Sequence, residues 1–415
     1  YLIKTYGMFS FAFSIYYMAI FFCFMGIPKI FTTFIIKKKD VSSVFYFLLL
    51  VSLAFFISGI IISIRYSWIL PLILALPFLL IRGVGISILN SDYKYNITQV
   101  IYALGALIVP LITYLLVKSG ELAITTGYAT GFIITSTIVY LLTHKKIKEI
   151  AQRVRFKIPV IKSYASKSLV ASSITLSFAF LGWIDSTILG LLSSFEKVAR
   201  YNIAGPISNV ITLIPISLSM FLLTRSAEEK NKRYSEGMFN RTLRLSFSFS
   251  LILAILINSF LFLLIKIFFP KYQGIEPFVM ILTAGIVFFS LYNLMYTYLA
   301  GKLKPEKALW PIVIAAVLNI ILDIILIPRF GLYGITIATT LAHLTAFTLL
   351  SAKMRIFRKY YLVYPLILAV PLSFYLGYAG ILTIMIVIPI LFLTKLIQKP
   401  DLEVVYKTIK SIFIS

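Results

Sequence analysis

Charged side chains lie inside long apolar stretches of the sequence, where a charge is costly. They are Lys29, Arg82, Asp185 and Asp323. A charge near the middle of a bilayer costs about 2.5–3.5 kcal/mol on insertion scales, so such residues usually pair with each other, face a water-filled cavity or bind a ligand. These residues are therefore the first candidates for a functional site.

The two basic candidates suit an anionic ligand. Guanidinium binds phosphate with two parallel hydrogen bonds, whereas an ammonium group acts as a point charge. We predict that Lys29 and Arg82 line a cavity and bind the phosphate of a substrate. Two alternatives stay open: Lys29 extends to the membrane surface, or Arg82 pairs with a carboxylate or with backbone carbonyls freed by Pro77.

The acidic and amide candidates allow several roles. Asp185 could pair with a cation in a cavity, accept a hydrogen bond from a sugar hydroxyl or carry a coupling proton. We place Asp185 with Asn209 among the predicted substrate-binding residues. Asp323 and Asn293 are predicted to be structural or coupling residues, because polar residues inside membrane helices often join neighbouring helices. For Asp323, an interhelical hydrogen bond is favoured.

Motifs of catalysis are missing from the sequence. It contains no nucleophile–base arrangement, no Gly-rich phosphate loop and no metal-binding motif. The single cysteine, Cys23, excludes an intrachain disulfide, and two histidines are too few for a metal cluster. We therefore expect no catalytic residues, no metal ligands, no cofactor and no enzyme activity; an ATP-driven pump would also need a phosphate loop.

The elements that must position these side chains are membrane helices. Of the 415 residues, 60% are hydrophobic and 13% are charged. Runs of about 20 apolar residues predict spanning helices. The fold class predicted is an all-α polytopic membrane protein with thirteen visible spans, at residues 6–36, 42–64, 67–90, 97–117, 121–143, 163–192, 200–223, 242–269, 275–300, 309–327, 331–351, 361–377 and 378–396.

The basic residues predict the orientation of these helices. The net charge is +25, and most of the 39 Lys and Arg residues fall in alternate gaps between the predicted spans. Lys and Arg mark cytoplasmic loops, so this pattern predicts a cell-membrane protein with a cytoplasmic C-terminus. The distribution argues against nucleic acid and favours contact with anionic lipids.

A faint internal repeat predicts two lobes. Lys94 corresponds to Lys304, and Gly120 corresponds to Gly331, each pair six spans apart. Related segments that point the same way indicate parallel lobes. Six spans per lobe leave the first lobe one short, so fourteen helices are expected, the first being absent from this sequence. The predicted units are an N-lobe at 1–143, a basic cytoplasmic linker at 144–162, a C-lobe at 163–351, and two extra helices with a tail at 352–415.

The stretch 318–341 predicts two helices packed side by side. Pro328 should end the first helix, Gly331 should reverse the chain, and Gly334 should allow close approach of the second helix. The run from Asn319 to Thr339 resembles the penultimate hairpin in the second lobe of polysaccharide-export flippases. These belong to the multidrug/oligosaccharidyl-lipid/polysaccharide exporter superfamily.

Other segments carry the same resemblance. Residues 300–305, Ala-Gly-Lys-Leu-Lys-Pro, resemble the cytoplasmic turn of that family. One departure is Asp323, where the family more often has Asn. The resemblance implies a transporter that flips a lipid-linked oligosaccharide or polysaccharide precursor by alternating access. Its expected partners are that substrate, membrane lipids, and a glycan polymerase or glycosyltransferases of the same pathway.

Two other functions remain as alternatives. One is an ion-coupled exporter of drugs or organic cations with the same fold. That function would favour a carboxylate within the first lobe, and the first five predicted spans hold none. The other alternative is a membrane glycosyltransferase or glycan polymerase, which is less favoured because the predicted outer gaps are too short for a catalytic domain.

Overall fold

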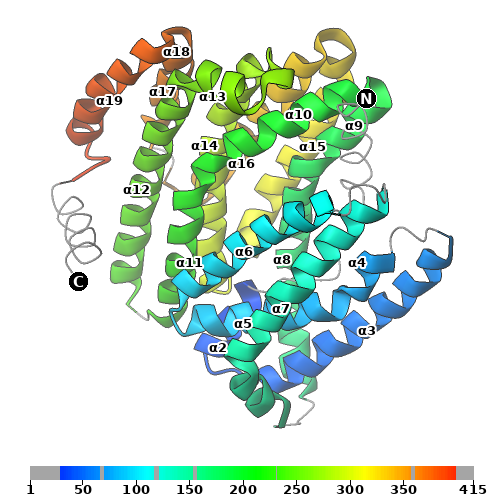
Figure 1. Cartoon of the computed structure of the whole chain (residues 1–415). Helices are drawn as coiled ribbons and strands as arrows, with labels where there is room; N and C mark the ends of the chain where they lie inside the picture. Colours follow the sequence, from blue (N-terminus) through cyan, green and yellow to red (C-terminus); the bar gives the residue numbers. More distant parts are fainter. Residues whose placement is uncertain are drawn as a thin grey trace, which may run out of the picture.

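A computed structural model describes residues 29–65, 70–115, 121–152, 157–229, 231–356 and 360–398 (Figure 1). Every regular element in these ranges is helical. Eight of the described helices are long and apolar enough to cross a membrane, and shorter apolar helices accompany them. The predicted fold class, an all-α polytopic membrane protein, is confirmed. The number of thirteen spans stays a prediction.

The first group of helices holds residues up to 152. In this group α7 packs against α3, α5 and α6, and α2 packs against α5. A break at Ala75 separates α4 from α5, and Pro77 occupies the first turn of α5, where a missing N–H is tolerated. The helices of this group are α2 (Lys29–Ile36), α3 (Val41–Arg65), α4 (Leu70–Leu74), α5 (Leu76–Ser91), α6 (Tyr95–Leu115) and α7 (Glu121–Gln152).

The long helix α7 runs past the predicted end of its span at residue 143. It continues to Gln152, so the first half of the predicted linker is a helical extension of the span. The Tyr46 hydroxyl donates to the carbonyl of Ala151 at 2.6 Å. This contact ties the helical extension to α3.

The second group follows from residue 158. Its central helix, α14, contacts α10, α11, α12 and α16, while α15 contacts α8 and α16. The helices are α8 (Ile158–Ala179), α9 (Asp185–Leu192), α10 (Phe195–Asn209), α11 (Leu213–Glu228), α12 (Lys232–Ser259), α13 (Leu261–Phe268), α14 (Glu276–Gly301), α15 (Glu306–Phe330) and α16 (Leu332–Lys353).

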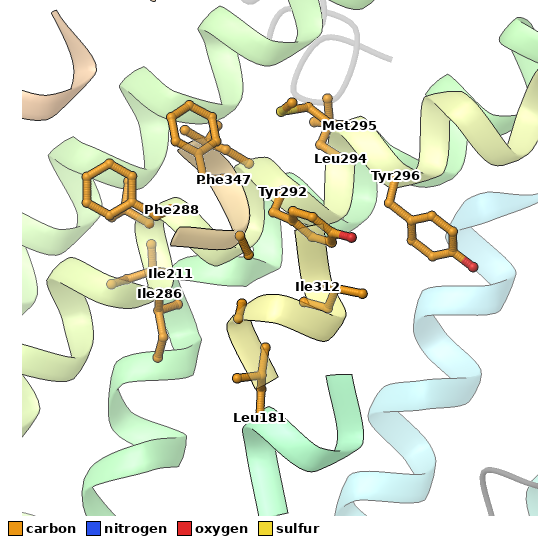
Figure 2. Close-up of a cluster of buried hydrophobic side chains, with 14 of the residues drawn as sticks. Leu181, Ile211, Ile286, Phe288, Tyr292, Leu294, Met295, Tyr296, Ile312 and Phe347 are labelled. Carbon is orange, nitrogen blue, oxygen red and sulfur yellow. The ribbon is translucent and has the colours of Figure 1, made fainter. Parts of the chain in front are cut away.

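The largest apolar core surrounds α14. Phe288, Tyr292 and Tyr296 of this helix are buried among side chains of neighbouring helices, including Phe347 of α16 (Figure 2). The Tyr292 hydroxyl donates to the carbonyl of Ala308 at 2.6 Å, so this buried polar atom is satisfied. The core holds the helices that carry the polar site described below.

The last helices lie beside α12, at the left of Figure 1. Short breaks interrupt them, in contrast to the two continuous spans predicted for 361–377 and 378–396. They are α17 (Val363–Leu366), α18 (Ala369–Tyr375) and α19 (Leu382–Leu393). The guanidinium of Arg244 on α12 donates to the carbonyl of Lys395 at 3.2 Å and helps to hold this segment in place.

The hairpin of α15 and α16 differs in one detail from the prediction. Pro328 does not end α15, which continues to Phe330. A proline removes one hydrogen bond of the last turns, but Gly331, at φ 55°, is the residue that reverses the chain. At Gly334 an added Cβ would lie 2.4 Å from the carbonyl oxygen of Leu326, so the close approach predicted for this glycine is confirmed.

The two groups of helices meet at one end of the molecule. We call it the basic end; its turns are 37–40, 92–94 and 302–305, which were predicted to be cytoplasmic. There α11 lies beside α2, α5 and α6 (Figure 1). The Thr224 hydroxyl donates to the carbonyl of Asn90 at 3.2 Å. The guanidinium of Arg225 lies 4.8 Å from the ring centroid of Tyr93.

The turn residue Tyr93 also joins the groups electrostatically. Burial raises the pKa of its hydroxyl, and the neighbouring carboxylate of Glu228, in the second group, raises it further. Tyr93 has a positive φ of 61°, which is uncommon for a non-glycine residue. The basic end is therefore closed by specific side chains from both groups.

Candidate functional site

Asp185 lies at a distortion of the helix that contains it. A π-helical turn, Phe180–Ile184, separates α8 from α9, and Asp185 is the first residue of α9. Such turns shift the side chains that follow them and are frequent at functional sites. Asp185 is completely buried, so its charge must be compensated inside the protein.

Three neighbouring helices provide hydrogen-bond donors to Asp185. The amide nitrogen of Asn319, on α15, donates to Oδ1 at 2.7 Å. The hydroxyl of Thr339, on α16, donates to Oδ2 at 2.6 Å, and the hydroxyl of Tyr201, on α10, donates to the same oxygen. Because α10, α15 and α16 all contribute one donor, this carboxyl joins four segments of the second group.

A second carboxyl lies next to the first. Asp323 follows Asn319 by four residues on α15, so both side chains lie on one face of this helix. The amide nitrogen of Asn319 donates to Oδ2 of Asp323 at 2.8 Å and thus bridges both carboxyls. Asp323 is completely buried.

The polar cluster formed by Asp185, Tyr201, Asn319, Asp323 and Thr339 is called here the carboxylate cluster. Two of its oxygens, Oδ1 of Asn319 and Oδ1 of Asp323, are buried without a hydrogen-bond donor. No described Lys, Arg or His side chain forms an ion pair with either carboxyl. Two adjacent carboxylates in a dry interior cannot both remain charged without a cation or a proton.

The donor set decides which cation would fit. Carboxylate, amide and hydroxyl oxygens are hard ligands that suit a small hard cation, and a bound proton would join the two carboxyls instead. No group of three or more His, Cys, Asp or Glu side chains able to hold a metal ion occurs among the described residues. Two ionised carboxylates carry a summed charge of −2, so one monovalent cation balances them only if one carboxyl keeps a proton.

Arg82 lies in the first group, apart from the carboxylate cluster. Its guanidinium carbon is 5.2 Å from the ring centroid of Tyr102 and 5.8 Å from that of Phe132. Aromatic faces stabilise a cation at this range. The structure therefore places Arg82, a residue of α5, against α6 and α7, where the two aromatic rings stabilise its positive charge.

The other predicted site residues are dispersed. Lys29 is the first residue of α2, and its side chain lies outside the described part of the chain. Asn209 is exposed at the end of α10. Asn293 is half-buried in α14, where its carbonyl accepts a hydrogen bond from Thr297. Among the predicted residues whose side chains the structure describes, Asp185 and Asp323 are the two that are brought together.

Sequence reasoning did not single out three members of the carboxylate cluster. Tyr201 and Thr339 belong to residue types that are common in membrane helices, so their positions carry no signal of their own. Asn319 was noticed only as part of a resemblance. The spacing of Asn319 and Asp323, four residues apart in an apolar helix, was the signal that could have identified a shared polar face.

A cavity of about 1220 Å³ opens between α11 and α12 near the basic end. Its charged lining includes Arg225, Arg233 and Arg241, and its apolar lining includes Leu218 and Phe221. Arg82, Asp185 and Asn209 do not line it. A cavity with a basic lining was predicted, but the residues expected to form it are not the ones that form this cavity.

The fold and the buried carboxylate cluster define a class: this is a multi-pass membrane protein with the two-lobe transporter fold. The family model described as MatE matches residues 171–325, a range that holds Asp185, Tyr201, Asn319 and Asp323. The match covers most of the second group of helices and none of the first.

Two uncharacterized membrane proteins of Methanocaldococcus jannaschii are similar in sequence. One is 31% identical over 169 residues, which are 39% of this chain and 33% of that relative. The other is 24% identical over 367 residues, which are 78% of this chain and 83% of that relative. The first alignment thus spans about a third of the length of that relative.

Solved structures show the same fold. The lipid II flippase MurJ in an inward closed conformation superposes with a TM-score of 0.64 at 18% identity and covers 96% of this chain and 93% of its own. An outward-facing multidrug resistance MATE family transporter superposes with a TM-score of 0.61 at 16% identity. The superposition covers 86% of this chain and 94% of that transporter. At these identities the likeness concerns the fold.

Proposed function

We propose that this protein moves a lipid-linked oligosaccharide or polysaccharide precursor across the membrane by alternating access, and that a monovalent cation or a proton drives the movement. The observation that carries the proposal is the carboxylate cluster. Its two carboxyls, Asp185 and Asp323, are adjacent and buried, and neither has a basic ion-pair partner among the described residues. Two oxygens of the cluster, Oδ1 of Asn319 and Oδ1 of Asp323, lack a hydrogen-bond donor. A coupling cation would supply the missing positive charge.

The position of the carboxylate cluster supports coupling to movement. It joins α9, α10, α15 and α16, and α10 continues through the turn Val210–Thr212 into α11. Helix α11 contacts the first group at the basic end, and α8 and α14 contact that group as well. Binding of a cation between Asp185 and Asp323 would pull α9 and α15 together and thereby bias the helix that closes the basic end.

The lipid-linked cargo is supported by the similarity of fold over almost the whole chain to a structure described as a lipid II flippase. Arg82 remains the proposed phosphate contact of the first group, and Lys29 is proposed as a second one. Tyr102 and Phe132 stabilise the Arg82 guanidinium, whose planar set of donors suits a phosphate.

A second candidate function is an exporter of small organic cations driven by the same ion. The MatE match, which includes both carboxyls of the carboxylate cluster, favours it. The two functions share the coupling site and differ in the cargo. An organic cation would be repelled by Arg82, whereas a lipid diphosphate would be attracted.

Complementation of a glycan-export mutant with the full-length gene tests the proposal. Wild type should restore surface glycan, while Asp185→Asn and Arg82→Ala should not. Glu306→Gln serves as the matched control, because it removes an exposed carboxylate that pairs with Lys167 at 3.3 Å. Restored drug efflux without surface glycan would favour the second function, and full glycan export by Asp185→Asn would overturn the coupling role of the carboxylate cluster.

A further inference from the structure

The hydroxyl of Tyr201 is directed at the carboxyl to which the coupling ion is proposed to bind. Tyr201 lies on α10, is buried, and donates to Oδ2 of Asp185. The hydroxyl of Thr339 donates to the same oxygen at 2.6 Å. A carboxylate oxygen offers about two lone pairs, so these two hydroxyls satisfy Oδ2 without any ion. An ion that binds this oxygen must therefore compete with them.

Both hydroxyls have a second acceptor within reach. Oγ1 of Thr339 lies 2.8 Å from the carbonyl oxygen of Ile335, on the same helix. The hydroxyl of Tyr201 lies 3.3 Å from Oγ1 of Thr339. If Thr339 donates to Ile335, its own oxygen can accept the hydrogen of Tyr201. In this second arrangement each hydroxyl hydrogen still has an acceptor, and Oδ2 of Asp185 has lost both donors.

The two arrangements differ in how the carboxylate cluster receives positive charge. In the first, two O–H groups direct their partial positive charges at Oδ2 of Asp185, which opposes a cation or a proton at that oxygen. In the second, Oδ2 joins Oδ1 of Asn319 and Oδ1 of Asp323, which lack a donor already. The first arrangement therefore suits the ion-free protein, and the second suits the protein with the ion bound.

The change between the arrangements involves movement of α10. A distance of 3.3 Å is long for a hydrogen bond between two hydroxyls, so a good bond from Tyr201 to Thr339 requires a shift of the phenol ring. The ring is buried and carried by α10, which continues through the turn Val210–Thr212 into α11. Thr224 of α11 donates to the carbonyl of Asn90 in the first group. The phenol thus links Asp185 to the helices that lead to the basic end.

We propose that the hydroxyl of Tyr201 competes with the coupling ion for Asp185, and that its displacement transmits ion binding to α10. The inference rests on the proposed function, because an ion must bind the carboxylate cluster. Tyr201 acts through Asp185 and is a positioning residue. By linkage, the work of displacing the phenol lowers the affinity of the wild type for the ion. Loss of the hydroxyl should therefore tighten ion binding and weaken its transmission, whereas loss of an ion ligand would weaken binding.

Tyr201→Phe in the full-length protein tests the inference. The matched control is Tyr292→Phe, which removes another buried phenol hydroxyl, one that donates to a backbone carbonyl at 2.6 Å. Tyr201→Met, a second variant without the hydroxyl, tests the same expectation if the Phe variant is unstable. Ion affinity is read from thermal unfolding as the half-saturating ion concentration, with sodium titrated at fixed pH and with pH titrated in the absence of sodium.

Transmission is read from the distance between spin labels on the two groups of helices. Lys94→Cys and Lys304→Cys place the labels at exposed positions in the turns of the basic end, and Cys23→Ser removes the native thiol. The distance is measured with and without the ion. A merely structural hydroxyl would not change the response of this distance to the ion.

Other titratable groups of the helices packed against α9 are present in wild type and variant alike, so the shift between the two proteins reports the phenol. The described titratable side chains of α10, α15 and α16 are Glu196, Lys197, Arg200, Tyr201, Glu306, Lys307, Asp323, Arg329, Tyr333, His343 and Lys353.

For the ion that stabilises the wild type, we expect half-saturation of Tyr201→Phe at an ion concentration about tenfold lower, which for protons is about one pH unit higher. The ion should no longer change the label distance in this variant, and Tyr292→Phe should keep wild-type values of both quantities.

Equal or weaker ion affinity in Tyr201→Phe, with a normal wild-type response, would overturn the inference and leave the proposed coupling intact. Tighter binding with an undiminished change of the label distance would also overturn it. If neither sodium nor protons act on the wild type, the proposed ion coupling fails and the inference fails with it.

Discussion

Replacing Asp185 by Asn should remove ion coupling while keeping the fold. The amide has nearly the same shape as the carboxyl, and its oxygen can still accept a hydrogen bond from Asn319 or Thr339. A cation about 4 Å from a carboxylate is stabilised by about 4 kcal/mol at an effective dielectric constant of about 20. Loss of one of the two carboxylates therefore predicts a decrease in cation affinity of roughly 10²–10³-fold.

The effect of Asp185 substitutions on the free energy of unfolding distinguishes a loss of ion coupling from a loss of folding. Asp185→Ala removes the acceptor of three donors, and each buried donor left without a partner costs about 1–3 kcal/mol. Thr339 can turn to the carbonyl of Ile335 at 2.8 Å, and Asn319 keeps its bond to Asp323. We expect a loss of about 2–4 kcal/mol for Ala and about 1–2 kcal/mol for Asn.

Thermal unfolding of the purified protein, titrated with sodium at several fixed pH values, measures both quantities. Wild type should be stabilised by a saturating cation, since a ligand at about 100 times its Kd contributes about 2.7 kcal/mol. Asp185→Asn should unfold at a slightly lower temperature, and sodium at the concentration that saturates wild type should no longer stabilise it. A full response in Asp185→Asn would refute the reasoning, because it would show that the carboxylate does not bind the cation.

Three further predictions concern other parts of the molecule. Gly334→Val should destabilise the protein by about 1–3 kcal/mol in thermal unfolding, because the new side chain collides with the backbone of α15; Gly237→Val, where an added Cβ has no atom within 4 Å, serves as control. Arg82→Gln should lower lipid flipping in proteoliposomes by about tenfold with little change in stability; unchanged flipping would assign Arg82 a structural role. Burial and the neighbouring Lys37 charge lower the pKa of Lys302, so raising the pH through that pKa should favour the closed basic end. Distances between spin labels should report this closure, and Lys302→Met should be closed at every pH.

The class of fold was predictable from composition because each span is recognised by its own apolar length. The turns inside the spans were less predictable. The π-helical turn before Asp185 has no sequence signature, and Pro328 was expected to end a helix that continues to Phe330. A proline near the last turn loses one hydrogen bond only, and the packing of α15 on α16 outweighs that loss.

The carboxylate cluster was predictable in part. Asp185 and Asp323 were recognised because a charge in an apolar segment needs a partner, but the sequence does not tell which helix provides it. Tyr201 and Thr339 become partners of Asp185 only through the packing of α10 and α16 against α9. Asn209, which was expected in the same site, lies at the exposed end of α10, because helix rotation decides which side chains face the interior.

Simultaneous recording of ion flux and lipid flipping in one set of proteoliposomes tests ion-driven transport most directly. A sodium or proton gradient should drive flipping of a fluorescent lipid diphosphate, and the ion should flow downhill in fixed proportion to it. Both fluxes should disappear together in Asp185→Asn and in Asp323→Asn. Flipping that proceeds without ion movement, or that survives in both variants, would contradict a coupling role for the two buried carboxyls.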